Sequence, residues 1–238
     1  MTTKARLRAN VRVIQASVVG RGATPGPPTN RYKLQTAEVL PVVFVDVLIL
    51  DNLATARMIR RIMTDNELIH RIRELAVLFG DFTLRSGRKS KYYIDKYRFS
   101  TDPQVLAELG RRFSLHVTDE VNKIAGAELG GVPLAAITSV TCNKPYVIVR
   151  NQKKDYGTSK LVEGIIEKGD RILLLEDILT TGGQVLEAAK SLQEAGAEIV
   201  KIVAVIDRLE GARANIESAG FELASLLTTA DLNLGGPH

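Results

Sequence analysis

One segment constrains the fold of this chain more than any other. Residues 172–184 read ILLLEDILTTGGQ, in which an apolar run, 172–175, leads into two adjacent carboxylates, Glu176 and Asp177. A short apolar run bounded by polar residues is typical of a buried strand. The residues TTGG at 180–183 then stand directly before a helical pattern. We expect a strand, a loop and a helix start, with the two carboxylates at the point where the strand ends.

The two halves of this segment suit two parts of one ligand. Ligands bind at the carboxyl ends of strands in open α/β sheets, and neighbouring carboxylates there can accept hydrogen bonds from the 2- and 3-hydroxyls of a ribose. A 5-phosphate would meet hydroxyls and backbone N–H groups at the positive end of the helix. The candidate binding residues are Glu176, Asp177, Ile178, Leu179, Thr180, Thr181, Gly182, Gly183 and Gln184. The alternative is a pair of solvated loop charges before a plain turn.

Other phosphate-binding patterns do not describe this segment. A nucleotide P-loop requires GxxxxGK[ST] and a dinucleotide-binding turn requires GxGxxG, and the segment contains neither. ATPase and NAD-dependent functions are therefore disfavoured.

The rest of the second half of the chain alternates between apolar runs and helical patterns. Expected strands lie at 123–126, 146–149, 171–175, 199–206 and 221–227, and residues 80–95 read as two short strands around a Ser-Gly turn. Helices are expected after Asp102-Pro103, near Pro133 and over 184–195. Such alternation predicts an α/β fold with a mainly parallel sheet.

The first 62 residues differ from the rest in charge and composition. Residues 1–33 carry seven Lys or Arg and no acid, and taking these from the net charge of +5 leaves −2 for residues 34–238. GATPGPPTN at 22–30 is typical of a linker or a disordered segment. We therefore divide the chain into an N-terminal extension, residues 1–62, and a catalytic domain, residues 63–238. The extension is either disordered or an artefact of the assigned start, with translation beginning at Met63 or Met58. A targeting peptide or a basic arm for nucleic acid are the alternatives.

Composition excludes several other classes of protein. One cysteine, Cys142, and three scattered histidines exclude a disulfide framework and a Cys/His zinc site, and Cys142 is expected to be a small buried hydrophobe. No apolar run reaches the length of a membrane span. We expect a soluble protein in a reducing compartment, the cytoplasm.

These segments together resemble a known family. ILLLEDILTTGG is similar to the phosphoribosyl pyrophosphate signature of type I phosphoribosyltransferases. Four further segments follow the order and character of orotate phosphoribosyltransferase: FTLRSGRKSKYYID at 82–95, GAELGGVPLA at 126–135, VRNQKKDYGT at 149–158 and VIDRLEGAR at 205–213. The resemblance covers about residues 64–231. It implies a mainly parallel sheet flanked by helices with a small N-terminal hood.

The resemblance also implies a reaction. The enzyme would join orotate to the ribose 5-phosphate of phosphoribosyl pyrophosphate with Mg²⁺, releasing pyrophosphate and giving orotidine 5′-phosphate for UMP synthesis. Mg²⁺ would be held mainly through the pyrophosphate, without protein ligands. The implied catalytic residues are Lys154 and Asp177, and further substrate contacts are Arg150, Tyr156, Arg208 and Arg85. The basic loop at 150–157 implies a homodimer with shared active sites.

The sequence departs from the family at three positions. Asn151 stands where a lysine is frequent, Tyr156 where a histidine is frequent, and Gly130 where some members have a lysine. Tyr156 cannot carry positive charge near neutral pH, so the hold on pyrophosphate is in question. Two other functions stay open: a non-catalytic regulator that senses phosphoribosyl pyrophosphate, and a purine phosphoribosyltransferase. Residues 1–62 show no helix-turn-helix pattern, which argues against nucleic-acid binding.

Overall fold

A computed structural model describes residues 62–83, 87, 89–151 and 161–234. The predictions for the N-terminal extension up to residue 61 lie outside these residues. The helices are α2 (Asp65–Ala76), α3 (Lys96–Ser100), α4 (Pro103–Ser114), α5 (Gly131–Cys142), α6 (Gly183–Glu194) and α7 (Ala212–Ser218). The strands are β1 (Val77–Thr83), β2 (Lys89–Ile94), β3 (Lys123–Ala127), β4 (Tyr146–Val149), β5 (Val162–Glu163), β6 (Arg171–Leu179), β7 (Glu198–Asp207) and β8 (Leu223–Thr228).

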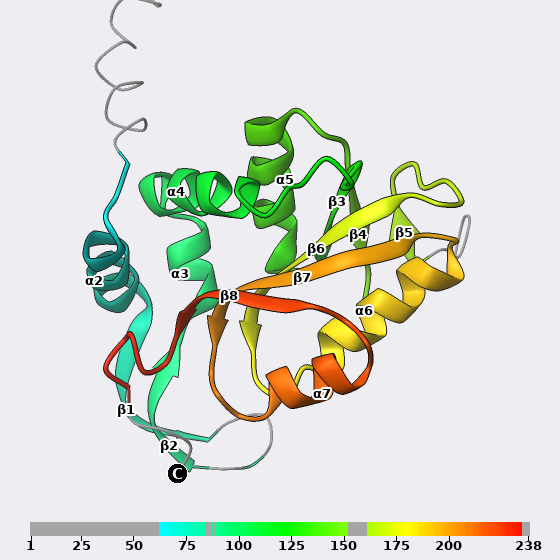
Figure 1. The fold of residues 1–238 in the computed structure, drawn as a ribbon. Helices are drawn as coiled ribbons and strands as arrows, with labels where there is room; N and C mark the ends of the chain where they lie inside the picture. Colours follow the sequence, from blue (N-terminus) through cyan, green and yellow to red (C-terminus); the bar gives the residue numbers. More distant parts are fainter. Residues whose placement is uncertain (1–61, 84–86, 88, 152–160, 235–238) are drawn as a thin grey trace, which may run out of the picture. The chain divides into compact units, whose positions relative to one another are not determined.

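The main sheet has six strands in the order β5-β4-β3-β6-β7-β8. All neighbours pair in parallel except β4 and the short edge strand β5, which are antiparallel. Helices lie on both faces of this sheet (Figure 1). The predicted α/β fold with a mainly parallel sheet is confirmed.

Two hydrophobic clusters fill the two sides of the sheet. In β6, Leu173 and Leu175 belong to the cluster that contains residues of α2, α4 and α5, whereas Ile172 and Leu174 belong to the cluster that contains α6 and α7. This alternation follows from the two-residue period of a strand. A run that is apolar at every position is therefore required, because both faces of β6 are covered.

The first described helix, α2, begins with a capping box at Thr64. Thr64 Oγ1 accepts a hydrogen bond from the backbone N–H of Glu67, and the Glu67 carboxylate accepts one from the backbone N–H of Thr64 at 2.9 Å. This capping box satisfies two N–H groups that have no partner within the helix. The backbone of Met63 is held too, because its carbonyl accepts from Arg112 at 3.2 Å and its N–H lies 3.4 Å from a carboxylate oxygen of Glu108.

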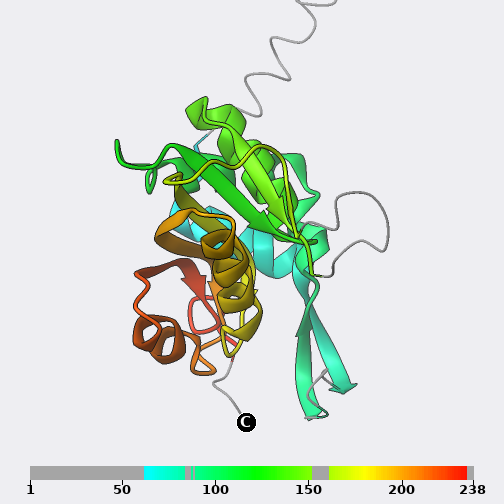
Figure 2. The ribbon, with the colours of Figure 1, turned by 90° about the vertical axis from the view of Figure 1, so that its right-hand side faces the viewer.

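The strands β1 and β2 form a separate antiparallel hairpin, which Figure 2 shows as a ribbon beside the main sheet. This confirms the two short strands expected within residues 80–95, although β1 already begins at Val77. Phe82 and Tyr93 face each other across the hairpin with ring centroids 5.7 Å apart. Tyr92 on the opposite side is buried.

One strand boundary and several short elements differ from the prediction. The sequence placed the end of the central strand at Leu175, which is wrong, because β6 pairs with β7 as far as Leu179, opposite Asp207. The acidic pair, Glu176 and Asp177, thus lies inside the strand. Counting apolar residues misses this, since strand pairing uses backbone groups and continues through buried carboxylates. The short elements α3, α7 and β5 were also missed.

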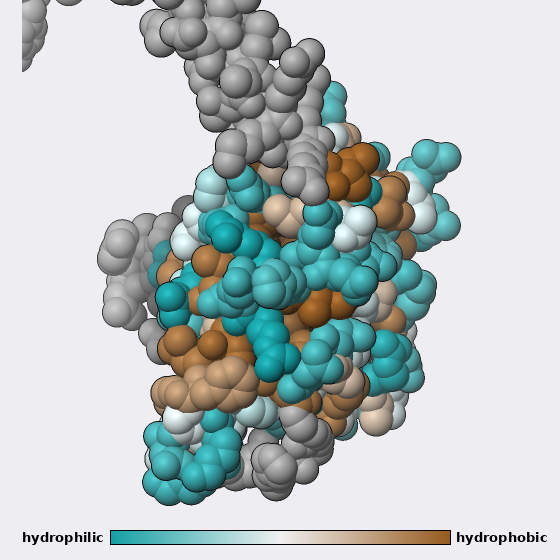
Figure 3. Space-filling model, turned by 90° about the vertical axis from the view of Figure 1, so that its left-hand side faces the viewer, coloured by the Kyte–Doolittle hydropathy of each residue, from teal (hydrophilic) through white to brown (hydrophobic). Residues whose placement is uncertain are grey.

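The remaining composition predictions concern the surface. Among the described helices none is long and apolar enough to cross a membrane. Cys142, the last residue of α5, was expected to be a small buried hydrophobe; it is partly buried and packs against the core. Figure 3 shows hydrophobic side chains exposed among hydrophilic ones on the face seen from the left of Figure 1.

Candidate active site

The site lies where the strand order of the sheet reverses. From β3 the chain continues to β4 on one side, and then returns to place β6 on the other side of β3. The carboxyl ends of the strands at such a reversal, here β3 and β6, are the usual ligand site of open α/β sheets. The acidic pair is on β6, and the turn at Gly130 follows β3.

The acidic pair is buried to a degree that is unusual for charged residues. Glu176 is 6% exposed and Asp177 is 1% exposed. Oε1 of Glu176 accepts a hydrogen bond from the backbone N–H of Asp177 at 2.9 Å, and Oδ1 of Asp177 accepts one from the backbone N–H of Ile178 at 2.6 Å. Oε2 of Glu176 has no hydrogen-bond partner within the described residues. These carboxylates are not solvated loop charges.

A lysine that the sequence analysis did not single out contacts this pair. Nζ of Lys96, the first residue of α3, lies 2.9 Å from Oδ2 of Asp177. Burial lowers the pKa of Lys96, but the charges of Asp177 and Glu176 outweigh burial and hold this pKa above its usual value. No local signal in the sequence marks Lys96, because the hairpin β1–β2 and α3 bring it to β6 only in the folded chain.

The charge state of the pair follows from burial and crowding. Burial raises the pKa of Glu176 to about 8, with the neighbouring charge of Asp177 acting in the same direction and Lys96 acting against it. Two adjacent buried carboxylates resist ionising together. The protonated Glu176 is therefore favoured below about pH 8.

The absence of a side chain at Gly130 leaves space for the carboxylate of Asp177. A Cβ atom placed on Gly130 would lie 1.4 Å from Oδ2 of Asp177, and on Gly131 it would lie 2.9 Å from the carbonyl oxygen of Leu175. No side chain fits at 130 without moving Asp177. This explains in physical terms why the chain has glycine where some family members have lysine.

The TTGG loop, residues 180–183, joins β6 to α6. Gly182 is the N-cap of α6, has φ +83 and supplies no side-chain cap, while a Cβ there would lie 3.1 Å from Ile216. Glycine is favoured for both reasons. The side chain of Asn215 on α7 donates to the carbonyl of Thr181 at 2.8 Å and so fixes the loop. The first N–H groups of α6 are thus the uncapped donors that an anion would meet.

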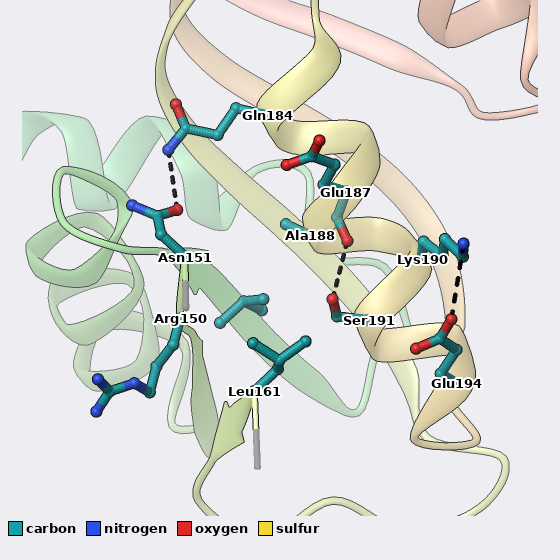
Figure 4. Close-up of a pocket in the computed structure, with 10 residues that line it drawn as sticks. Arg150, Asn151, Leu161, Gln184, Glu187, Ala188, Lys190, Ser191 and Glu194 are labelled. Carbon is teal, nitrogen blue, oxygen red and sulfur yellow. Dashed lines mark hydrogen bonds and ion pairs between the residues drawn. The ribbon is translucent and has the colours of Figure 1, made fainter. Parts of the chain in front are cut away.

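The carboxyl end of β4 is organised by amide groups. Nδ2 of Asn151 donates to the carbonyl of Glu128 at 2.9 Å, and Nε2 of Gln184 donates to Oδ1 of Asn151 at 3.0 Å (Figure 4). The backbone N–H of Arg150 donates to the carbonyl of Leu161 at 2.8 Å. Asn151 therefore connects the turn after β3 to the start of α6.

A pocket of about 270 Å³ lies beside these residues, between α6 and the ends of β4 and β5 (Figure 4). Its lining includes Arg150, Asn151, Gln184 and Lys190 but neither residue of the acidic pair. Arg150 itself lies 3.7 Å from a carboxylate oxygen of Glu163. The pocket therefore lies beside Asn151 and Gln184 and does not include the acidic pair.

Comparison with known proteins identifies the family. Residues 104–222 match the phosphoribosyl transferase domain. An orotate phosphoribosyltransferase of Natronomonas pharaonis is 47% identical over 171 residues, which are 71% of this chain and 98% of that protein. The chain belongs to the orotate phosphoribosyltransferase family. Like other members of this family, it is a transferase of the glycosyltransferase type, as the sequence predicts.

Solved structures agree with this orotate phosphoribosyltransferase assignment. The Mycobacterium tuberculosis orotate phosphoribosyltransferase, in complex with 5-phospho-alpha-D-ribosyl 1-diphosphate, is 34% identical with a TM-score of 0.62 and covers 71% of this chain and 99% of its own. An adenine phosphoribosyltransferase of Leishmania donovani, 18% identical with a TM-score of 0.56 over 74% of this chain and 87% of its own, shares the fold alone. The type I phosphoribosyltransferase fold is confirmed.

In this orotate phosphoribosyltransferase, Arg208 follows β7 at the same edge of the sheet as the acidic pair, since its backbone N–H donates to the carbonyl of Leu179 at 2.9 Å. Nε lies 2.9 Å from a carboxylate oxygen of Glu210, and the guanidinium lies over the ring of Tyr92, 5.6 Å from its centroid. Both side chains of the ion pair are largely buried. Tyr92 packs in the core and also faces Arg208.

Three predicted substrate contacts lie outside the described residues: Arg85, Lys154 and Tyr156. Their roles stay predictions. Among the described residues, no three His, Cys, Asp or Glu side chains gather in a way that could hold a metal ion.

Proposed function

We propose that this protein transfers ribose 5-phosphate from phosphoribosyl pyrophosphate to orotate, giving orotidine 5′-phosphate and pyrophosphate. One observation carries the proposal: a buried acidic pair, with Lys96 2.9 Å from Asp177, stands on the strand that leads directly into a helix start without a side-chain cap. A sugar diol and a phosphate are the two groups that such a pair and such a helix end bind. Orotate is proposed as the base because the relatives are named orotate phosphoribosyltransferase.

The sugar half of the substrate is assigned to β6 and α6. Asp177 and Glu176 would hold the ribose hydroxyls, Asp177 as acceptor and the protonated Glu176 as donor or acceptor. The 5-phosphate would lie against the TTGG loop and the side chain of Gln184. Ile178 and Leu179 supply the backbone that connects the two subsites.

The leaving group is assigned to the loop that begins at Arg150. Cleavage at the anomeric carbon passes through a state with oxocarbenium character, so the pyrophosphate must be stabilised as it departs. Arg150, Lys154 and Tyr156 are the residues proposed for this, with Lys154 the catalytic cation. Mg²⁺ would be held mainly by the pyrophosphate and would neutralise its charge.

The base is assigned to Arg208, with Arg85 as a second cation. A guanidinium binds a carboxylate through two parallel hydrogen bonds, and orotate carries a carboxylate. Because Glu210 engages Nε of Arg208, the two terminal nitrogens are the atoms proposed to meet orotate. Glu210 and Tyr92 would hold the guanidinium in place.

The direct test is turnover. The purified full chain, mixed with orotate, phosphoribosyl pyrophosphate and Mg²⁺, should remove the absorbance of orotate. Arg208→Gln should raise the KM for orotate by about tenfold or more, since a charge-assisted hydrogen bond contributes about 1.5–3 kcal/mol. Arg213→Gln is the matched control, because Arg213 pairs with Glu217 on the surface of α7. Absence of turnover under saturating conditions would falsify the proposal.

Competition between bases separates the alternatives. A purine phosphoribosyltransferase would prefer adenine or hypoxanthine over orotate and would leave Arg208 without a role. A non-catalytic regulator would bind phosphoribosyl pyrophosphate without turnover, and its basic arm would bind nucleic acid at low salt in a filter assay. We favour the enzyme because relatives at 42–49% identity carry the name orotate phosphoribosyltransferase.

The assembly and the compartment are further parts of the proposal. We propose a cytoplasmic homodimer in which the loop after Arg150 completes the partner's site. Sedimentation of the full chain measures the assembly. Mixing two inactive variants, one altered at Lys154 and one at Asp177, should restore about a quarter of the activity if sites are shared, by random pairing of subunits.

A further inference from the structure

Lys96 stands apart from the surface lysines of this chain. Its side chain is 29% exposed, and its Nζ lies 2.9 Å from Oδ2 of Asp177, whose side chain is 2% exposed. It is the first residue of α3, directly after Asp95, which caps that short helix by accepting from the backbone N–H of Tyr97 at 3.2 Å. The position of Lys96 is therefore set by the hairpin and by this cap rather than by solvent.

The acidic pair needs a cation at this place. Two adjacent buried carboxylates repel each other, and a buried charge without a partner is costly. Asp177 and Lys96 act on the charge of Glu176, and Asp177, Glu176 and Tyr97 act on that of Lys96. Lys96 is thus a cation that faces both carboxyls.

The space around Asp177 has a fixed arrangement. Gly130 closes one side, where even a Cβ atom would collide with Oδ2, and Lys96 contacts the same oxygen. Oδ1 is held by the backbone N–H of Ile178. The carboxylate thus has three neighbours that leave it one orientation, and Lys96 is the only one of the three that carries charge.

We propose that Lys96 is a positioning residue for ribose: through the contact of 2.9 Å between its Nζ and Oδ2 of Asp177, it fixes this carboxylate in the orientation that accepts a ribose hydroxyl. Lys96 acts through Asp177 and not on the 5-phosphate. The inference rests on the proposed function of the acidic pair. It adds a residue from α3, outside the β6–α6 segment, to the sugar subsite.

A merely structural role for Lys96 makes a different prediction. If the ion pair only fastened α3 to β6, its loss would lower the melting temperature and weaken all ligands to a similar degree. If Lys96 positions Asp177 for the sugar, its loss would weaken ligands that carry the ribose and spare a ligand that has only the phosphate. Ribose 5-phosphate and inorganic phosphate are therefore the two probes.

The experiment is calorimetric titration of the full chain with phosphoribosyl pyrophosphate, ribose 5-phosphate and inorganic phosphate. Lys96→Met should weaken both ribose-bearing ligands about tenfold or more, as expected for one lost charge-assisted contact, and should change phosphate binding by less than about twofold. Lys96→Arg keeps the charge and should restore ribose 5-phosphate binding to within about threefold. Lys168→Met is the control, because Lys168 is exposed at the opposite end of the sheet.

Several outcomes overturn the proposal. Ribose 5-phosphate binding that is unchanged in Lys96→Met, or an equal loss for all three ligands, would show that Lys96 does not act on the sugar. If Lys96→Met does not fold, Lys96→Gln and Lys96→Arg are compared, and equal affinities for ribose 5-phosphate in these two variants likewise overturn it. Wild-type protein that binds ribose 5-phosphate but does not consume orotate refutes the proposed reaction and leaves the Lys96 result valid. Wild-type protein that does not bind ribose 5-phosphate overturns both.

Discussion

The carboxyl ends of β6 and β4 lie at the same edge of the parallel sheet but are built in different ways. On β6, the acidic pair is almost completely buried, and its charge is matched by Lys96 at 2.9 Å. At the end of β4, Asn151 is exposed and makes neutral hydrogen bonds to Glu128 and Gln184. One end depends on buried charges and the other on exposed amides.

This difference indicates how much change each end tolerates. A buried charge that loses its partner is strongly destabilised, whereas an exposed amide that loses a hydrogen bond binds water instead. We therefore expect the sugar subsite to be intolerant of substitution and the base of the loop to be tolerant. The departure from the family at Asn151 falls at the tolerant end.

The strongest test of this comparison is Asp177→Asn. The amide keeps the shape but removes the charge that faces Lys96, so we expect kcat/KM for phosphoribosyl pyrophosphate to fall by about 100-fold, as when one preorganised polar group is removed from an active site. Steady-state kinetics measure this. Asp119→Asn, an exposed change in the turn before β3, should have no effect. Unchanged kinetics in Asp177→Asn would remove the acidic pair from the sugar subsite.

Glu176→Gln tests the same end through pH. The folded pKa of Glu176, about 8, lies above its ordinary value of 4.5, so its contribution to stability is fully present below about pH 4.5 and is lost as pH rises through about 8. Because Gln cannot ionise, the melting temperature of the variant should fall less than that of the wild type as pH rises from 5 to 8. Thermal melts across this range measure the difference. Parallel curves for the two proteins would contradict the raised pKa.

At the tolerant end, Asn151→Ala should have a small effect. It removes two exposed neutral hydrogen bonds, and at about 0.5 kcal/mol each, the low end of the usual range, we expect kcat/KM to fall by roughly fivefold. A double-mutant cycle with Gln184→Ala isolates the contact of 3.0 Å between the two side chains. A loss as large as that of Asp177→Asn would erase the contrast between the two strand ends.

The smallest effect is expected from removing residues 1–62. The capping box of Thr64 and the contacts of the Met63 backbone with Glu108 and Arg112 lie within the domain proposed at residues 63–238. A chain that begins at Met63 should therefore keep the melting temperature and the turnover of the full chain. A lower melting temperature for the shorter chain would extend the domain into the N-terminal segment.

Some parts of the site could be predicted from the sequence and others could not. The binding segment 172–184 can be recognised from the sequence alone, because a buried strand, two carboxylates and a glycine-rich helix start are features of neighbouring residues. The sequence predicted the end of β6 four residues too early, at Leu175 instead of Leu179. The pairing partner, β7, lies elsewhere in the sequence, so no local pattern marks where the pairing ends. Arg208 was recognised only through the resemblance, and its ion pair with Glu210 needed the structure.

The sequence by itself determined the class of fold, the strand that carries the acidic pair and the family, because hydrophobic periodicity, helix caps and a contiguous motif are written in neighbouring residues. Only the tertiary structure decided which groups surround that pair. Lys96 comes from α3, Gly130 from the turn after β3, and both meet Asp177 through the packing of separate elements. Charge pairing and steric room depend on distances in space, and these follow from how the strands are ordered in the sheet.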